Sequence, residues 1–213
     1  MKMRVFIGLF LAVTLFTGCR TAYYSTMEKF GVHKRDLLKK RVVAARDEQQ
    51  EASEQFKDAL TRIREMYKVD GGDLEKTYDE LKKDYDQSAE RAEAVRKRID
   101  DVETVASDLF KEWEKEIQDI STPSLRQNSS QKLRETQQRY NEMITALNQA
   151  ESSMEPVLTR FKDQVLYLKH NLNAAAVASL KGESINIQAE ITKLLQDMNN
   201  AIAKADKFIQ AMP

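Results

Sequence analysis

Apolar residues spaced alternately four and three positions apart run from Leu74 to Trp113, and this pattern constrains the fold more than any other feature of the sequence. The spacing places apolar side chains on one stripe of an α-helix, as in the seam of a coiled coil. No glycine or proline lies between Gly72 and Pro123. With a rise of about 1.5 Å per residue, the helix would be roughly 70 Å long, so the pattern predicts a rod. The seam consists of Leu74, Tyr78, Leu81, Tyr85, Ser88, Ala92, Val95, Ile99, Val102, Ala106, Leu109 and Trp113.

The same spacing precedes this segment and predicts a first helix from about Ser25 to Val69. The helix is expected to stop at Gly71 and Gly72, because glycine accepts the left-handed conformation at a helix C-terminus. Its seam consists of Leu38, Val42, Ala45, Gln49, Ala52, Phe56, Ala59, Ile63 and Met66.

A third helix is predicted from Pro123, which suits a first helical turn, to about Lys181. Pro156 lies inside this segment and removes a backbone donor, but the seam crosses it unchanged, which indicates one kinked helix. The seam consists of Leu133, Thr136, Tyr140, Met143, Leu147, Ala150, Met154, Val157 and Phe161, then slips one place near Val165 and continues through Leu168, Leu172 and Ala175.

Gly182 is interpreted as the end of the third helix, and a shorter fourth helix is predicted from about Ser184 to Ala211. Its seam consists of Ile187, Ile191, Leu194, Met198, Ala201, Ala205, Phe208 and Met212.

Short connections make consecutive helices antiparallel neighbours. The sequence therefore predicts an all-α fold, an elongated antiparallel coiled-coil-like bundle of three long helices with a shorter fourth helix covering the distal half. On this arrangement the fourth helix ends level with about Pro156, and Phe56 lies near Ser88 across the first hairpin. The polar seam residues Gln49 and Gln164 are expected to set the register as buried polar groups.

The N-terminus has the features of an export signal. Lys2 and Arg4 precede an apolar run that ends near Phe16. This run is shorter than the roughly 20 residues that span a bilayer as a helix. Phe16-Thr17-Gly18-Cys19 resembles the lipobox of bacterial lipoproteins, in which the cysteine is acylated and becomes the new N-terminus. The alternatives are a cleaved soluble signal peptide with an incidental cysteine, and an uncleaved hydrophobic tail.

This interpretation divides the chain into a lipoprotein signal peptide (1–18), a lipid anchor with a short linker (19–24) and a helical rod (25–213). By the same resemblance, Arg20 after the cysteine favours export to the outer membrane, facing the periplasm. The membrane would then be a partner through the N-terminal lipid. Tyr23 and Tyr24 could lie at the headgroup level, or they could begin the packing face of the first helix.

The sequence offers no pattern for catalysis, a metal, a nucleotide or another cofactor. His33 and His170 are far apart, and neither has a second ligand at metal-binding spacing. Glycine-rich phosphate loops and nucleophile elbows are missing from the sequence. Cys19 is the only cysteine, so no intramolecular disulfide can form. Without residues 1–18 the net charge is −2, which gives no reason to expect a nucleic-acid partner.

One cluster of cations follows the predicted anchor: Lys34, Arg35, Lys39, Lys40 and Arg41. Close to a membrane surface, these residues could contact lipid phosphates or an anionic wall polymer. The interpretation favoured by the sequence is that they form a solvated helix face balanced by later carboxylates.

The segment from Tyr23 to Leu38 resembles the opening of an uncharacterised proteobacterial family of coiled-coil lipoproteins, known as domain of unknown function 2959. Residues Val42 to Asp47 and Gln49 to Ala52 continue the likeness, which covers the mature chain. The resemblance implies a long helical protein at the envelope. The family has no assigned activity, so no functional residues carry over from it.

These observations predict a non-enzymatic envelope lipoprotein that acts as a periplasmic scaffold, spacer or adaptor through its helical surfaces. The alternative is a binding module for a lipid headgroup or a wall polymer, using the basic cluster near the membrane. A third reading, an intracellular coiled-coil factor, requires the export signal to be false. An envelope protein partner fits the first reading, and the oligomeric state is left open.

Overall fold

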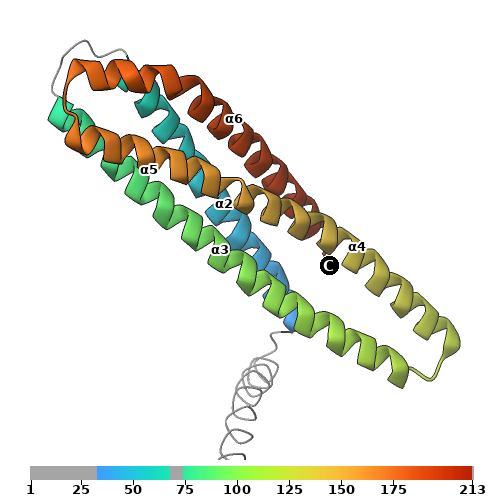
Figure 1. Ribbon diagram of the computed structural model, residues 1–213. Helices are drawn as coiled ribbons and strands as arrows, with labels where there is room; N and C mark the ends of the chain where they lie inside the picture. The colour runs from blue at the N-terminus through green and yellow to red at the C-terminus, as the bar shows by residue number, and fades with distance from the viewer. Residues whose placement is uncertain (1–32, 68–73, 213) are drawn as a thin grey trace, which may run out of the picture.

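The computed structural model describes residues 33–67 and 74–212, the side chains of residues 174, 183 and 184 excepted, and every regular element in these ranges is an α-helix (Figure 1). The all-α prediction is confirmed, but the division into three long helices and one short helix is not. The helices are α2 (Lys34–Met66), α3 (Leu74–Asp119), α4 (Pro123–Ser152), α5 (Met154–His170) and α6 (Ala174–Ala211).

Helices α2 and α3 form an antiparallel hairpin. Two ion pairs show the direction: Arg62 pairs with Glu80 at 3.3 Å near the connection, and Arg41 pairs with Asp101 at 3.2 Å farther from it. All nine predicted seam residues of α2 are buried, whereas the seam of α3 is fully buried only between its two ends. Seam spacing therefore identified the packed faces of both helices correctly.

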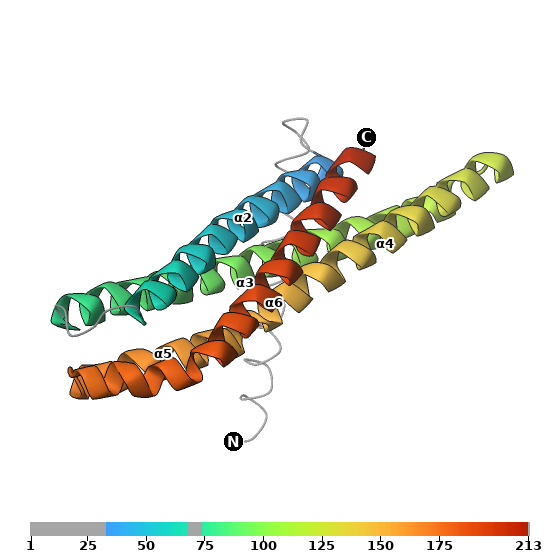
Figure 2. The ribbon, with the colours of Figure 1, turned by 90° about the horizontal axis from the view of Figure 1, so that it is seen from above.

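The remaining helices close the bundle. Helix α3 packs against α4 and α5, and α6 packs against α4, α5 and α2. Since α5 continues α4, the cross-section is a ring in which α2, α3, α4 or α5, and α6 follow one another (Figures 1 and 2). Lys204 of α6 reaches Glu142 of α4 at 3.3 Å, and Arg160 of α5 reaches Glu190 of α6 at 2.7 Å. These pairs make α6 antiparallel to both helices.

The predicted third helix is divided at Ser153, where the structure separates α4 from α5 by one residue. Ser153 keeps a right-handed helical backbone (φ −76°, ψ −12°), and α5 continues along the path of α4 (Figure 1). Pro156 has no N–H to donate to the carbonyl of Ser152, four residues earlier, and its ring crowds that carbonyl. Proline therefore explains why the regular helix is interrupted here.

The predicted boundary at Gly182 is wrong, because the chain turns at residues 171–173 and Gly182 lies inside α6. Asn173 caps the helix: its Oδ1 accepts a hydrogen bond from the N–H of Ala176 at 2.9 Å, and asparagine is a favoured N-cap. Leu172, assigned above to the seam, is 43% exposed. Helix α6 is therefore 38 residues long, and the predicted short fourth helix does not exist.

The predicted end of the last helix beside Pro156 is also wrong. The carbonyl of Met212 accepts a hydrogen bond from Lys39 Nζ at 3.4 Å, so α6 ends close to the start of α2. Helices α3 and α4 continue beyond this level and form a two-helix projection (Figure 2). We call residues 117–130 the projecting hairpin. The narrowing from four helices to two thus lies at the end where α2 begins.

Candidate functional site

The five cations predicted as a surface cluster lie on different sides of α2. Lys34 pairs with Glu112, and Arg41 donates to Asp101 at 3.2 Å. Lys34 and Arg41 are seven residues apart and therefore lie on the same face of α2. Both of their partners belong to α3, so this face of α2 packs against α3. These two cations therefore face α3 and are engaged in pairs within the first hairpin.

The other three cations of the cluster diverge. Lys39 contacts the end of α6 through the carbonyl of Met212. Arg35 lies 3.7 Å from Asp36 and lines a cleft between α2, α3, α4 and α6, whereas Lys40 is exposed. The predicted cluster therefore does not form one basic surface, and three of its members contact other helices.

Exposed apolar side chains gather at the opposite end of the bundle, where α5 is connected to α6 (Figure 1). Of the five large apolar residues that are exposed among the described residues, four lie here: Leu166 (47%), Tyr167 (41%), Leu172 (43%) and Ile185 (75%). We call these four residues the distal apolar set. Leu166 borders a cleft between α5 and α3, whereas Tyr167 borders a groove between α5 and α6, so the set surrounds this end of the bundle on more than one side.

A groove between α5 and α6 adjoins the distal apolar set, with a volume of about 490 Å³. Tyr167 and the buried side chain of Gln164 line it. Within the described residues, Gln164 Oε1 has no hydrogen-bond partner. A buried acceptor without a donor is costly, so a docked partner that supplied an N–H or O–H group here would gain free energy from the contact.

Charged side chains border this groove. Arg160 lines it and is paired with Glu190 of α6 through a hydrogen bond from Nε to Oε1 of 2.7 Å, and Asp163 lies beside them. The groove therefore combines apolar side chains, one buried acceptor without a partner among the described residues, and charged side chains.

Sequence reasoning did not identify the distal apolar set. Leu166 and Tyr167 follow the seam residue Val165, and Ile185 precedes the seam residue Ile187 by two positions. For Leu166, Tyr167 and Ile185 the available signal was therefore a large apolar residue off the seam, whereas Leu172 was assigned to the seam and is exposed because the chain turns there.

The described part of the chain contains no group of three or more His, Cys, Asp and Glu residues placed to hold a metal ion. His33 lies at the start of α2 and His170 at the end of α5. None of the described helices combines the length and hydrophobicity that crossing a bilayer requires.

Cys19, Tyr23, Tyr24 and the predicted signal peptide (1–18) lie outside the described residues. Lipidation at Cys19 therefore remains a prediction from the sequence.

Comparison with curated proteins gives no match. The family described as "Protein of unknown function (DUF2959)" matches residues 23–212. This match covers all five helices described above, so the likeness noted from Tyr23 to Leu38 extends over nearly the whole chain. The chain therefore belongs to the DUF2959 family.

Proposed function

We propose that the protein is a non-enzymatic lipoprotein of the bacterial envelope, anchored through Cys19. Its helical bundle would extend into the periplasm and act as an adaptor of fixed length. The observation that carries the proposal is the separation of two ends: α2 begins at one end of the bundle, and the distal apolar set lies at the other (Figure 1). The 33 residues of α2 alone place these ends about 50 Å apart. The lipid would hold one end at the outer membrane, and the other would dock an envelope protein.

The bundle's side-chain contacts support a mechanical role. Ion pairs join α2 to α3, α2 to α6 and α5 to α6, as in Arg41–Asp101, Arg46–Asp206 and Arg160–Glu190. Each exposed pair stabilises little alone, about 0–1 kcal/mol. Together with the buried seams they favour one arrangement of the helices, which an adaptor of defined length requires.

The first experiment tests the anchor. Intact mass and membrane fractionation of the native chain are compared with those of Cys19→Ser. An acylated mass that begins at Cys19, together with a variant that is unprocessed or released from the membrane, supports the lipoprotein assignment. An unmodified full-length chain in the cytosol would refute it and favour the intracellular reading.

The second experiment tests docking at the distal end. A photo-crosslinking amino acid at Tyr167 is expected to give a discrete adduct with an envelope protein in intact cells, and the same group at Lys97, exposed near the middle of α3, is not. Ile185→Lys should abolish the adduct. Leu125→Lys is the matched control, because Leu125 is the fifth exposed large apolar residue (59%) and lies in the projecting hairpin at the other end. Equal adducts from both labelled positions would contradict the proposal.

Binding of a lipid headgroup or wall polymer by the basic cluster has less support. Lys34, Lys39 and Arg41 contact α3 or α6, so a ligand would have to compete with these contacts or rely on Arg35 and Lys40.

A further inference from the structure

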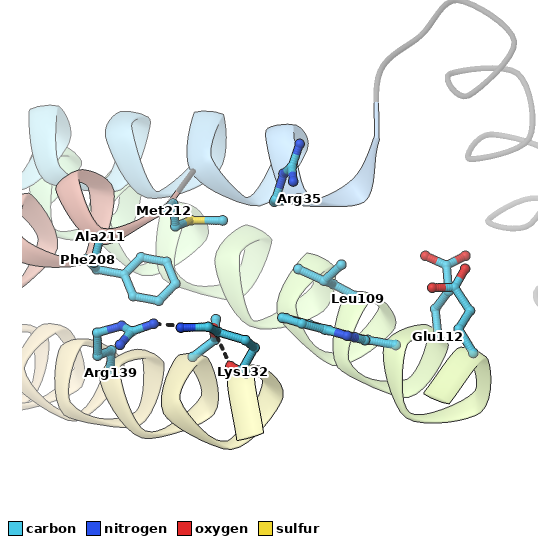
Figure 3. Close-up of a pocket in the computed structure, with 11 residues that line it drawn as sticks. Arg35, Leu109, Glu112, Lys132, Arg139, Phe208, Ala211 and Met212 are labelled. Carbon is cyan, nitrogen blue, oxygen red and sulfur yellow. Dashed lines mark hydrogen bonds between the residues drawn. The ribbon is translucent and has the colours of Figure 1, made fainter. Parts of the chain in front are cut away.

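A cleft of about 540 Å³ lies where the bundle narrows from four helices to two (Figure 3). Helix α2 begins here and α6 ends here, whereas α3 and α4 continue into the projecting hairpin. The seam residues Leu109 and Trp113 of α3 are therefore only partly covered here, whereas farther along the bundle the seam is enclosed by other helices. We call this space the open-end cleft.

Apolar side chains from two helices form the base of the open-end cleft: Leu109 and Trp113 of α3, and Phe208 and Met212 at the end of α6. The indole Nε1 of Trp113 donates to Ser129 Oγ of α4 at 2.9 Å. The polar atom of the indole is thus satisfied by α4, and the rest of the ring offers only carbon to an occupant.

The surroundings of this base are poor in water. Phe208 is 2% exposed, and its ring lies 6.2 Å from that of Tyr140 in an edge-to-face arrangement. Burial raises the pKa of Tyr140 above its ordinary value, with a smaller contribution from the charge of Glu103. The half-buried ring of Tyr140 therefore packs behind Phe208 as part of the same aromatic contact.

Cations outnumber carboxylates around the rim. Arg35, Lys132 and Arg139 line the cleft from α2 and α4, together with the carboxylates of Glu112 and Glu116 from α3. Glu112 is already paired with Lys34, which approaches from the side of α2. Lys132 is likewise paired with Glu135 at 3.5 Å, and Arg35 lies 3.7 Å from Asp36. The rim therefore presents two guanidinium groups from different helices, Arg35 and Arg139, above an apolar base.

We propose that the open-end cleft binds a single-chain anionic amphiphile, with its acyl chain against Trp113 and Phe208 and its carboxylate or phosphate head between Arg35 and Arg139. The cleft volume lies within the roughly 300–1,000 Å³ of small-molecule sites, and an apolar base with a few convergent charges is the usual composition of such sites. The inference does not depend on the lipid at Cys19 or on docking at the distal end. It assigns a ligand to the end of the bundle where α2 begins.

The test is photolabelling of the full-length chain in the membranes of the cells that produce it. Three diazirine-bearing probes with the same acyl chain are compared: a fatty acid, a lysophosphatidylglycerol and an uncharged monoacylglycerol. Adducts are located by mass spectrometry of peptides. The proposal predicts that adducts of the two anionic probes concentrate on peptides containing Leu109 and Trp113 and on the peptide containing Phe208, and that unlabelled fatty acid competes with them.

Two sets of variants test the site. Ala211→Phe fills the cleft and should remove the adducts; Ala189→Phe, at an exposed alanine of the same helix away from the cleft, should not. The double variant Arg35→Gln with Arg139→Gln changes only charge, and its adduct yield should fall by about fivefold, since each pair contributes roughly 0.5 kcal/mol. Arg134→Gln is the matched control on an exposed part of α4.

The outcomes are decisive in both directions. Labelling by the fatty acid alone, by the lysophospholipid alone, or by both identifies the head as carboxylate, phosphate or either, and each supports the proposal. Equal labelling by the uncharged probe with no effect of the arginine variants would overturn it. Adducts spread evenly along the helices, or adducts unchanged by Ala211→Phe in a protein of native helical content, would also overturn it.

Discussion

Gln49 has the most unusual environment of any polar side chain in the described core. It occupies a seam position of α2, it is fully buried, and neither its amide nitrogen nor its amide oxygen has a hydrogen-bond partner within the described residues. An unsatisfied buried amide costs about 1–3 kcal/mol. The sequence predicted a buried polar seam residue here, and burial is confirmed, whereas its role in setting the register stays a prediction.

The first prediction concerns this residue. Gln49→Leu should raise the free energy of unfolding by about 1–3 kcal/mol, because the variant removes the desolvation cost and keeps a similar volume. Urea titration followed by circular dichroism measures the change. Gln50→Leu, at the adjacent exposed position, should stay within about 0.5 kcal/mol of the native chain. A loss of stability in Gln49→Leu would mean that the amide is satisfied.

The second prediction distinguishes the two possible starts of α6. An added Cβ at Gly182 would meet nothing within 4 Å, so Gly182→Ala should stabilise the protein by about 0.5–1 kcal/mol, the helix propensity difference. Asn173→Ala should destabilise it by about 1 kcal/mol through loss of the cap. Thermal unfolding of both variants provides the measurement. If Gly182 ended a helix in the left-handed conformation, Gly182→Ala would instead be destabilising.

At the scale of elements, the contact between α4 and α6 includes an exposed ion pair that makes part of the stability depend on pH. The hydrogen bond from Lys204 to Glu142 is the main cause that lowers the pKa of this carboxyl below 4.5, followed by a hydrogen bond from Gln138. A carboxyl whose pKa is lower in the folded state stabilises the fold above its unfolded pKa. That contribution is lost as the pH falls through the folded value.

The third prediction follows from this sign. The difference in melting temperature between the native chain and Glu142→Gln should be present at pH 7 and should disappear as the pH falls through the lowered pKa of the folded state, where the native carboxyl also becomes protonated. Thermal unfolding between pH 3 and pH 7, on the order of one measurement per pH unit, tests it. Asp58→Asn, at an exposed position of α2, is the control for a general effect of removing a negative charge.

The projecting hairpin has fewer neighbouring helices than any other part of the described bundle. Residues 121–128 are all exposed, and α2 and α6 do not extend along this part of α3 and α4 (Figure 2). Helices gain most of their stability from packing of an apolar face, so a pair without further neighbours opens more readily.

The fourth prediction is therefore a gradient of hydrogen exchange along α4. Amides in residues 124–130 should exchange at least about tenfold faster than those in 143–150, a difference of about 1.4 kcal/mol in opening free energy. Met143, Leu147 and Ala150 in the protected segment are fully buried. Hydrogen–deuterium exchange with mass spectrometry gives the comparison within one helix. Equal protection would show that the hairpin has a partner.

At the scale of the whole molecule, α3 sets the length of the rod. Its 46 residues extend about 69 Å as one helix, and the other helices pack along it. The ends of the bundle are therefore well separated, with the open-end cleft and the start of α2 at one end and the distal apolar set at the other. Two different surfaces can act at the same time on such a molecule.

The fifth prediction tests this length in the full chain in its membranes. Spin labels at Glu75→Cys and Lys115→Cys, both exposed and near the ends of α3, should be separated by about 60 Å. Pulsed electron–electron double resonance measures the distance between the two spin labels, and a much shorter value would mean that α3 is bent or folded back. If Cys19 is acylated, its thiol is not free, and spin counting should find two labels per chain. A third label would contradict lipidation.

The sequence by itself determined the helical class, the buried face of nearly every helix and the direction of the first hairpin. These properties depend on local periodicity: seam residues such as Leu38, Val95 and Met198 are buried wherever their helix lies in the bundle. The export signal and Cys19 are also local patterns, and they stay predictions because they lie outside the described residues.

Only the tertiary structure decided where the last two helices meet and what their ends expose. Both Asn173 and Gly182 are acceptable helix boundaries on local grounds, and Val177 and Leu180, which become buried in α6, favour the earlier one. This choice lengthens α6, moves its end beside α2, opens the cleft next to Trp113 and places the distal apolar set at one end of the bundle. These features depend on the relative lengths of helices far apart in the sequence, which local periodicity does not encode.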